Sequence, residues 1–245
     1  MKFVNSHASW SDPIRHRIGP IRTSIRRRIA PRQFKETYIN EALANRQGSV
    51  YVEIGVRSGY SFRSVHAGRK IGVDPVRTQE MQELRAGEEF FTMGSDRFFA
   101  EEAPDLFSVR KIDVALVDGL HEFGQALRDV LNLERFMVPN GLIVLDDCNP
   151  PTLERGSDIP NGGEWNGDVW KVAAFLREQR PDLRYVTVNA DEGIGLLSSF
   201  AQPKAHPDAE TVSKYKELNY SYLEQHRAEV LNLVSPGAMN SLWDR

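Results

Sequence analysis

The sequence predicts an α/β protein built on a mostly parallel β-sheet with helices on both faces. Short apolar segments that end in glycine or an acidic residue alternate with segments whose apolar residues recur at helical spacing. Repeated strand–helix units of this kind join parallel strands, and the connecting helices cover both faces of the sheet. The length of 245 residues, with 40% hydrophobic and 27% charged residues, suits one such domain with short additions.

The expected elements follow one another along the chain at short intervals. We expect five strands at residues 49–54, 70–74, 89–93, 112–117 and 142–145, and helices at residues 60–68, 78–87 and 123–137. Residues 101–109 are expected to form an irregular crossover with some helix. Two more strands, 183–188 and 194–197, flank a turn at 191–193 and predict a terminal antiparallel hairpin. The predicted sheet therefore has seven strands.

The second half of the chain contains a long loop and an additional helix. Residues 148–167 are rich in Pro, Gly and Asn, and a loop of this length in a compact domain is typical of a lid or binding loop. Asp168 is expected to cap the helix that follows this loop. Residues 209–234 predict a further helix that covers the core or builds an oligomer. We expect an N-terminal arm (1–38), a central domain (39–200) and a C-terminal helical extension (201–245).

The N-terminal arm is basic and amphipathic. Residues 13–32 contain seven arginines and no acidic residue, and isoleucines repeat there at helical spacing around Gly19-Pro20. We expect this arm to dock on the body of the domain or on a partner subunit. An anionic membrane surface and nucleic acid are the alternative partners for such a segment.

The overall composition excludes several classes of protein. A formal net charge of −3 gives no global positive field, so we expect no nucleic-acid partner. The single cysteine, Cys148, excludes an intramolecular disulfide and a cysteine-built zinc site, and suits a reducing cytoplasm. No stretch is apolar enough for a secretory core or a membrane span. The sequence therefore predicts a cytoplasmic protein without stable membrane insertion.

A glycine-containing turn follows the first predicted strand. Gly55 and Gly59 bracket three residues between this strand and the next helix, where the backbone can approach a ligand and helix N–H groups are free. Asp74 ends the second strand, where an acid can bind both hydroxyls of a ribose. The spacing is not that of dinucleotide binding and favours a nucleoside without phosphates. The alternatives are a solvated strand end for Glu53 and a helix cap for Asp74.

Five motifs lie in order at the predicted strand ends: VEIGVRSGYS, IGVDP, TMGSD, VDGLHEF and PNGLIVLDD. Over residues 49–197 they resemble class I S-adenosylmethionine-dependent methyltransferases. The resemblance implies a Rossmann-like sheet and a cofactor-binding catalytic domain at residues 39–200. It implies that the methionine end of the cofactor lies against Glu53, Gly55, Ser58 and Gly59, its ribose against Asp74, and its adenine near Ser95 and Asp96, with Ser61 and Asp118 completing the set.

Carboxylates gather at the ends of two neighbouring predicted strands. Asp118 ends the fourth strand, with His121 three residues later, and the fifth strand ends in Asp146 and Asp147. A single crossover helix makes these strands neighbours, so the three carboxylates should open onto one crevice. Adjacent strand residues point to opposite faces, so the chain must turn here, as the Asn-Pro-Pro at residues 149–151 favours. Three carboxylates suit Mg²⁺. Alternatively, the aspartates cap turns and His121 is a surface loop residue.

The Asp-Gly-x-His motif together with the Asp-Asp pair is similar to the metal-dependent sugar O-methyltransferases of macrolide deoxysugars and bacterial saccharides. This similarity implies that Asp118, Asp146 and Asp147 bind Mg²⁺ and that His121, beside Asp118, acts as general base on a hydroxyl of a sugar or oligosaccharide. We expect a homo-oligomer, with a dimer favoured. The alternatives are a metal-independent O-methyltransferase of a phenol or natural product, and a non-catalytic binding module that uses the arginine-rich arm.

Overall fold

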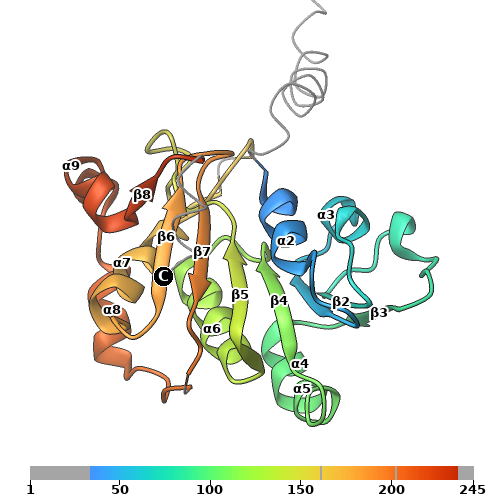
Figure 1. The fold of residues 1–245 in the computed structure, drawn as a ribbon. Helices are drawn as coiled ribbons and strands as arrows, with labels where there is room; N and C mark the ends of the chain where they lie inside the picture. Colours follow the sequence, from blue (N-terminus) through green and yellow to red (C-terminus); the bar gives the residue numbers. More distant parts are fainter. Residues whose placement is uncertain (1–33, 161, 202, 237–245) are drawn as a thin grey trace, which may run out of the picture.

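The computed structural model describes residues 34–160, 162–201 and 203–236. Its centre is one eight-stranded sheet with the strand order β3-β2-β1-β4-β5-β7-β6-β8 (Figure 1). The strands are β1 (Val50–Ile54), β2 (Arg69–Asp74), β3 (Glu88–Thr92), β4 (Ile112–Val117), β5 (Met137–Leu145), β6 (Arg184–Val188), β7 (Ile194–Ser198) and β8 (Leu233–Val234). The predicted α/β fold class is confirmed.

The pairing of the strands follows the prediction. β1 to β5 pair in parallel, whereas β7 runs antiparallel to both β5 and β6 and so forms the predicted hairpin. The eighth strand, β8, pairs in parallel with β6 over two residues, Leu233 and Val234. A strand of this length has no period that sequence reasoning can detect, which is why seven strands were predicted.

Helices cover both faces of the sheet (Figure 1). They are α2 (Lys35–Leu43), α3 (Tyr60–Ser64), α4 (Ser95–Glu101), α5 (Ala103–Leu106), α6 (Phe123–Glu134), α7 (Trp170–Gln179), α8 (Ala209–Lys216) and α9 (Tyr220–Leu231), with a 3₁₀ turn, η2, at Gln79–Met81. Helices α4 to α9 pack over one face and α2 and α3 over the other. Alternate residues of β1 face the two cores, with Val50 and Val52 on one side and Tyr51 on the other.

The helix predicted at residues 60–68 ends at Ser64, and the one predicted at 123–137 ends at Glu134. Two other predicted helices differ more from the observed ones. Residues 78–87 form only the short η2 turn, because the Arg77 guanidinium donates to the carbonyl oxygens of Met81 and Gln82 that a helix would use, both at 2.9 Å. The predicted helix 209–234 is divided into α8 and α9. Asn219 causes the break, because its side chain accepts a hydrogen bond from the Tyr222 N–H and starts α9 as its N-cap.

The prediction that Asp168 caps the helix after the long loop is wrong. The N-cap of α7 is Val169, and the Asp168 carboxylate instead accepts a hydrogen bond of 2.5 Å from the Phe123 N–H at the start of α6. Asp168 also forms a buried ion pair of 2.9 Å with Lys171. The carboxylate therefore ties the end of the long loop to α6, the helix that follows His121.

The two ends of the chain extend past the described residues. Residues 13–32 of the predicted arm lie outside them, and the expected boundary between arm and domain falls within α2, whose Tyr38 and Ile39 are buried against the sheet. The predicted C-terminal extension packs on the domain, since the Tyr215 ring meets Phe175 edge-on at 5.2 Å. Among the described residues, no helix is long and apolar enough to cross a bilayer.

Candidate functional site

Two adjoining pockets open at the carboxyl ends of β1, β2 and β4. The first, of about 410 Å³, includes Ser95 and Asp96 among its lining residues, and the second, of about 420 Å³, includes Glu53. The two pockets share Gly55 and Asp74. The carboxyl edge of an open α/β sheet is where ligands bind in this architecture, so the pockets lie where the sequence predicts the cofactor.

Gly55 brings β1 and β4 into close contact between the two pockets. Its φ is +87°, and a β-carbon added to it would lie 2.1 Å from the backbone oxygen of Asp118. The site therefore requires glycine at this position. Gly59, which the resemblance places in the cofactor site, lies outside both linings; it is the N-cap of α3, and an added β-carbon would lie 2.2 Å from the Met81 sulfur.

Asp74 holds the loop after β1 in place. One carboxylate oxygen accepts hydrogen bonds from the Val56 and Arg57 N–H groups, at 2.9 and 2.8 Å, and the other accepts one from Val76 at 2.8 Å. The side chain lines both pockets. Asp74 thus positions the backbone that surrounds the place predicted for the ribose.

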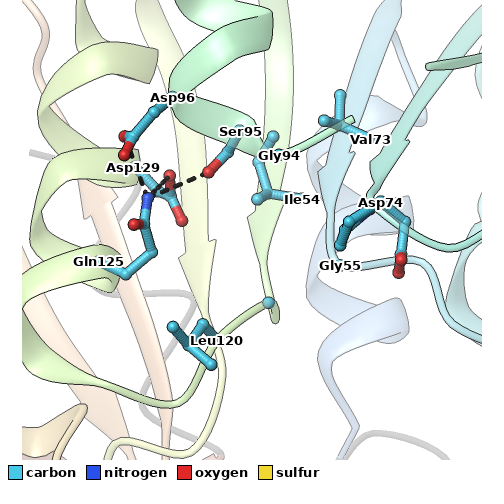
Figure 2. A pocket seen from close by; sticks show the side chains of 12 residues that line it. Ile54, Gly55, Val73, Asp74, Gly94, Ser95, Asp96, Leu120, Gln125 and Asp129 are labelled. Atoms are coloured by element: carbon cyan, nitrogen blue, oxygen red, sulfur yellow. Dashed lines mark hydrogen bonds between the residues drawn. The ribbon is translucent and has the colours of Figure 1, made fainter. Parts of the chain in front are cut away.

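The first pocket has a polar wall built from two helices (Figure 2). The Gln125 amide of α6 donates to Ser95 Oγ and to a carboxylate oxygen of Asp96, both at 3.1 Å, and to Asp129 at 3.0 Å. Burial raises the pKa of Asp129 to about 6. Ser95 and Asp96 were predicted here. Gln125 and Asp129 were missed because they lie inside a helix, although polar residues four apart on its buried side are a detectable signal.

Glu53 is a buried carboxyl group in the wall of the second pocket. Its side chain accepts a hydrogen bond of 2.7 Å from the Tyr51 hydroxyl. Burial raises the pKa of Glu53 to about 8, although the Tyr51 hydrogen bond opposes the shift. Ser58 and Ser61 line the same pocket, and Ser61 Oγ donates to Glu36 at 3.0 Å. In the free protein Glu53 is therefore mostly neutral at pH 7.

The two aspartates after β5 are separated by a turn of the chain. Asp147 adopts a φ of +61°, a conformation that non-glycine residues rarely take. The Asn166 amide donates to Asp147 Oδ1, and the Cys148 N–H donates to the Gly193 oxygen at 2.9 Å. The predicted turn exists, but Asp147 itself makes it, ahead of Pro150 and Pro151. Cys148 is fully buried, and burial raises the pKa of its thiol.

His121 lies between Asp118 and Asp147. Its Nδ1 lies 2.8 Å from the Trp165 carbonyl oxygen and 3.2 Å from Asp147 Oδ2, and its Nε2 lies 3.6 Å from Asp118 Oδ1. A carbonyl oxygen only accepts hydrogen bonds, so Nδ1 carries a proton and Nε2 holds the lone pair of the neutral ring. The Trp165 ring stacks on the imidazole at 5.7 Å. The long loop thus fixes both the tautomer and the orientation of His121.

Three of these residues form a group that could hold a metal ion. One ligand atom from each of Asp118, His121 and Asp147 lies within 4.8 Å of the others. Asp146, the third acid predicted to bind Mg²⁺, is not in this group. Its carboxylate instead contacts the ammonium group of Lys35, which also lies 2.5 Å from Asp118 Oδ2. Lys35 of α2 is the residue of this site that sequence reasoning missed.

This charged corner of the site consists of five residues: Lys35, Asp118, His121, Asp146 and Asp147. Their charges shift one another's pKa values. Burial lowers the pKa of His121, but the carboxylates of Asp118 and Asp147 raise it to about 9. Burial raises the pKa of Asp147 to about 6 against the opposing charge of His121. Burial raises the pKa of Asp118, but the charges of Lys35 and His121 lower it below its usual value. At neutral pH the corner therefore holds an ammonium and an imidazolium among three carboxyl groups.

A family model matches the part of the chain that holds most of these residues. Residues 52–148 match the model of a methyltransferase domain. The match ends at Cys148 and includes Glu53, Gly55, Asp74, Asp118 and both aspartates after β5. A comparison with curated proteins found no match.

Solved structures are also similar to this chain. One is the O-methyltransferase TomG of Streptomyces achromogenes, involved in tomaymycin synthesis and solved with S-adenosylmethionine. It is 16% identical with a TM-score of 0.50, over 67% of this chain and 78% of that one. Another is the Podospora anserina methyltransferase PaMTH1, solved with S-adenosylhomocysteine, at 15% identity and a TM-score of 0.48, over 73% and 85% of the two chains. At this identity the likeness to TomG shows the class I methyltransferase fold.

Proposed function

We propose that the chain is an S-adenosylmethionine-dependent O-methyltransferase that uses a divalent cation, Mg²⁺, to methylate a hydroxyl group of a sugar or saccharide. One observation carries the proposal: Asp118, His121 and Asp147 converge within 4.8 Å, and Asp118 and His121 also line the second of the two pockets that meet at Gly55. The base and the acids thus face the place where the methyl group of the cofactor would lie.

The two adjoining pockets suit the two halves of the cofactor. The first, with Gln125, Ser95 and Asp96 in its polar wall, would take the adenosine. The second, with the buried Glu53 carboxyl, would take the methionine end, whose ammonium group needs a negative partner. TomG, which shares the fold, was solved with S-adenosylmethionine, and this supports the same cofactor here.

The residues of the corner fit a divalent cation. Asp118, Asp146 and Asp147 would hold it, and two features of the structure support this: a cationic group already lies between Asp118 and Asp146, and the other Asp146 oxygen is buried without a hydrogen-bond partner among the described residues. A bound divalent cation supplies Lewis acidity, which lowers the pKa of a coordinated hydroxyl group.

His121 would take the proton of the acceptor hydroxyl through Nε2, the nitrogen that the Trp165 carbonyl leaves free. In the structure, Asp118 and Asp147 keep His121 protonated at neutral pH, with a pKa of about 9. A divalent cation bound to these acids would oppose their effect on the pKa of His121 and so favour proton abstraction.

A third cavity, of about 550 Å³, suits the acceptor. Its lining combines the apolar side chains of Phe34 and Leu233 with the polar side chains of Asn149, Glu192 and Arg227. The hydrogen-bonding groups of this lining suit the hydroxyl groups of a saccharide. The cavity is linked to the corner, because the Asn166 amide donates both to Glu192, at 2.7 Å, and to Asp147.

Chelation tests the proposal. We expect methyl transfer from labelled S-adenosylmethionine to a panel of saccharides to fall at least about 100-fold in EDTA and to recover with added Mg²⁺, since a Lewis acid supplies several kcal/mol of transition-state stabilisation. Undiminished transfer in EDTA would remove the metal from the mechanism. Methylation of phenols with no saccharide methylated would remove the sugar.

The contact of Lys35 with both aspartates favours a second candidate, a metal-independent O-methyltransferase of a small phenol or natural product. In that enzyme the ammonium group of Lys35 would supply positive charge beside the acceptor oxygen. The EDTA experiment separates the two candidates, because the second one keeps its activity in the chelator.

The buried Glu53 makes cofactor binding depend on pH. The pKa of Glu53 is about 8 in the free protein. Below pH 8, binding of an ammonium group at its carboxylate therefore requires that Glu53 release its proton. The affinity for S-adenosylhomocysteine should therefore rise with pH up to about 8, by at most tenfold per unit. Calorimetric titration between pH 6.5 and 8 measures this slope. Glu53→Gln should bind more weakly and lose the slope, and an unchanged slope in this variant would place the ammonium elsewhere.

A further inference from the structure

We infer that Lys35 is a built-in competitor of the divalent cation: its ammonium group occupies the cation position between Asp118 and Asp146 and must leave before an ion binds there. The inference rests on the proposed divalent-cation function of this corner and adds a means of controlling it. It assigns a role to α2, the helix that links the site to the N-terminal segment.

The geometry of Lys35 is that of a bound cation. Its Nζ lies 2.5 Å from Asp118 Oδ2 and contacts Asp146 Oδ2, and its side chain is only 12% exposed. On the far side of Asp118, His121 lies 3.6 Å away and continues to Asp147. Positive and negative groups thus alternate through the whole corner, and the ammonium takes the place between the ends of β4 and β5.

A divalent ion and Lys35 cannot share this place. An ammonium group has three donors and no lone pair, so it cannot become a ligand of the ion. Two cations held a few ångströms apart in a buried site repel each other strongly. Lys35 occupies the Oδ2 atoms of Asp118 and Asp146, so an ion that binds these two oxygens requires that the Lys35 side chain move away.

The position of Lys35 in its helix has no local explanation. It is the first residue of α2, where the helix dipole disfavours positive charge, and the N-cap Phe34 offers no side-chain hydrogen bond. The ion pairs with Asp118 and Asp146 are therefore what hold the ammonium there. Lys35 also lines the second pocket, so its side chain borders open space on the side away from the acids.

Mn²⁺ binding to the full-length protein tests this role without measuring activity. We expect Lys35→Met to bind Mn²⁺ at least about tenfold more tightly than wild type in a titration followed by electron paramagnetic resonance, because the competing cation is gone. Lys35→Arg should behave like wild type. Lys70→Met is a matched control, since Lys70 is also buried and pairs with Glu88 at 2.9 Å at the opposite edge of the sheet, and should leave Mn²⁺ affinity unchanged.

A second measurement uses the wild-type protein, so it does not depend on the folding of a variant. Lys35 should react slowly with an amine-acylating reagent and faster in saturating Mn²⁺, as followed by peptide mass spectrometry, while Lys70 should not change. Equal labelling of Lys35 with and without Mn²⁺, or no gain in affinity in Lys35→Met, would overturn the inference.

The outcomes also separate this inference from the proposed function. Suppose that wild type binds Mn²⁺, that Asp146→Asn does not, and that Lys35→Met binds no more tightly than wild type. The metal site then stands and the competition by Lys35 is refuted. If neither wild type nor Lys35→Met binds Mn²⁺, both the inference and the metal-dependent mechanism are refuted.

Discussion

Replacing His121 with alanine should reduce the turnover number for methyl transfer by about 10²- to 10⁴-fold, the usual contribution of a general base. His121 is held by the Trp165 carbonyl and by two carboxylates, so its Nε2 is the basic atom that faces the corner. The Michaelis constant for the cofactor should change little, because no step of cofactor binding requires this proton transfer. Initial rates with labelled cofactor at saturating acceptor measure both constants.

His66→Ala is the matched control for this variant. His66 is exposed and lies at the amino edge of the sheet, where only its backbone N–H binds Asn40, so this change should leave turnover unaltered. His121→Asn keeps a side-chain donor near the position of Nδ1 but lacks a base, and should be as slow as His121→Ala. Near-normal turnover in both His121 variants would mean that another group takes the proton.

Replacing Gly55 with alanine should destabilise the fold by about 2–6 kcal/mol and abolish cofactor binding. Two costs add. The first is backbone strain, because a non-glycine residue at a φ of +87° is strained by about 1–3 kcal/mol. The new β-carbon would also lie 2.1 Å from the Asp118 oxygen, so β1 and β4 must move apart at a similar overpacking cost. Urea unfolding and calorimetric titration with S-adenosylhomocysteine measure the two effects.

Gly94→Ala is the control for Gly55→Ala. Gly94 also borders the first pocket, but its φ is −68° and an added β-carbon meets no atom within 4 Å. The free energy of unfolding of Gly94→Ala should therefore stay within about 0.5 kcal/mol of the wild-type value, as for surface substitutions that disturb no special feature. Equal stability of the Gly55 and Gly94 variants would contradict the close contact between β1 and β4.

Most of the fold was predictable because its elements are periodic and ordered. The alternation of strands and helices predicted a mainly parallel sheet, and the single crossover α6 predicted that β4 and β5 are neighbours, which their pairing confirms. The errors lie where side chains override local preference. Arg77 takes the carbonyl groups of an expected helix, and Asn219 starts a new helix inside another.

Only the site residues that lie at the ends of strands could be predicted from the sequence. Asp118 and Asp147 come directly after apolar strands, so their convergence follows from the topology. Lys35 reaches Asp118 and Asp146 from 83 and 111 residues away along the chain, in a helix whose short sequence carries no motif. Asn166 reaches Asp147 from the irregular loop. Contacts of this kind depend on tertiary packing, which neither periodicity nor spacing encodes.

The burial of Cys148 has a practical consequence for following Lys35. The chain has no other cysteine, and this one is inaccessible and held as the thiol. Cysteines introduced on the exposed faces of α2 and of the loop over His121 would then be the sole sites of attachment for spin labels in the native protein. The separation between helix and loop can thus be followed during a cation titration with every native side chain of the corner in place.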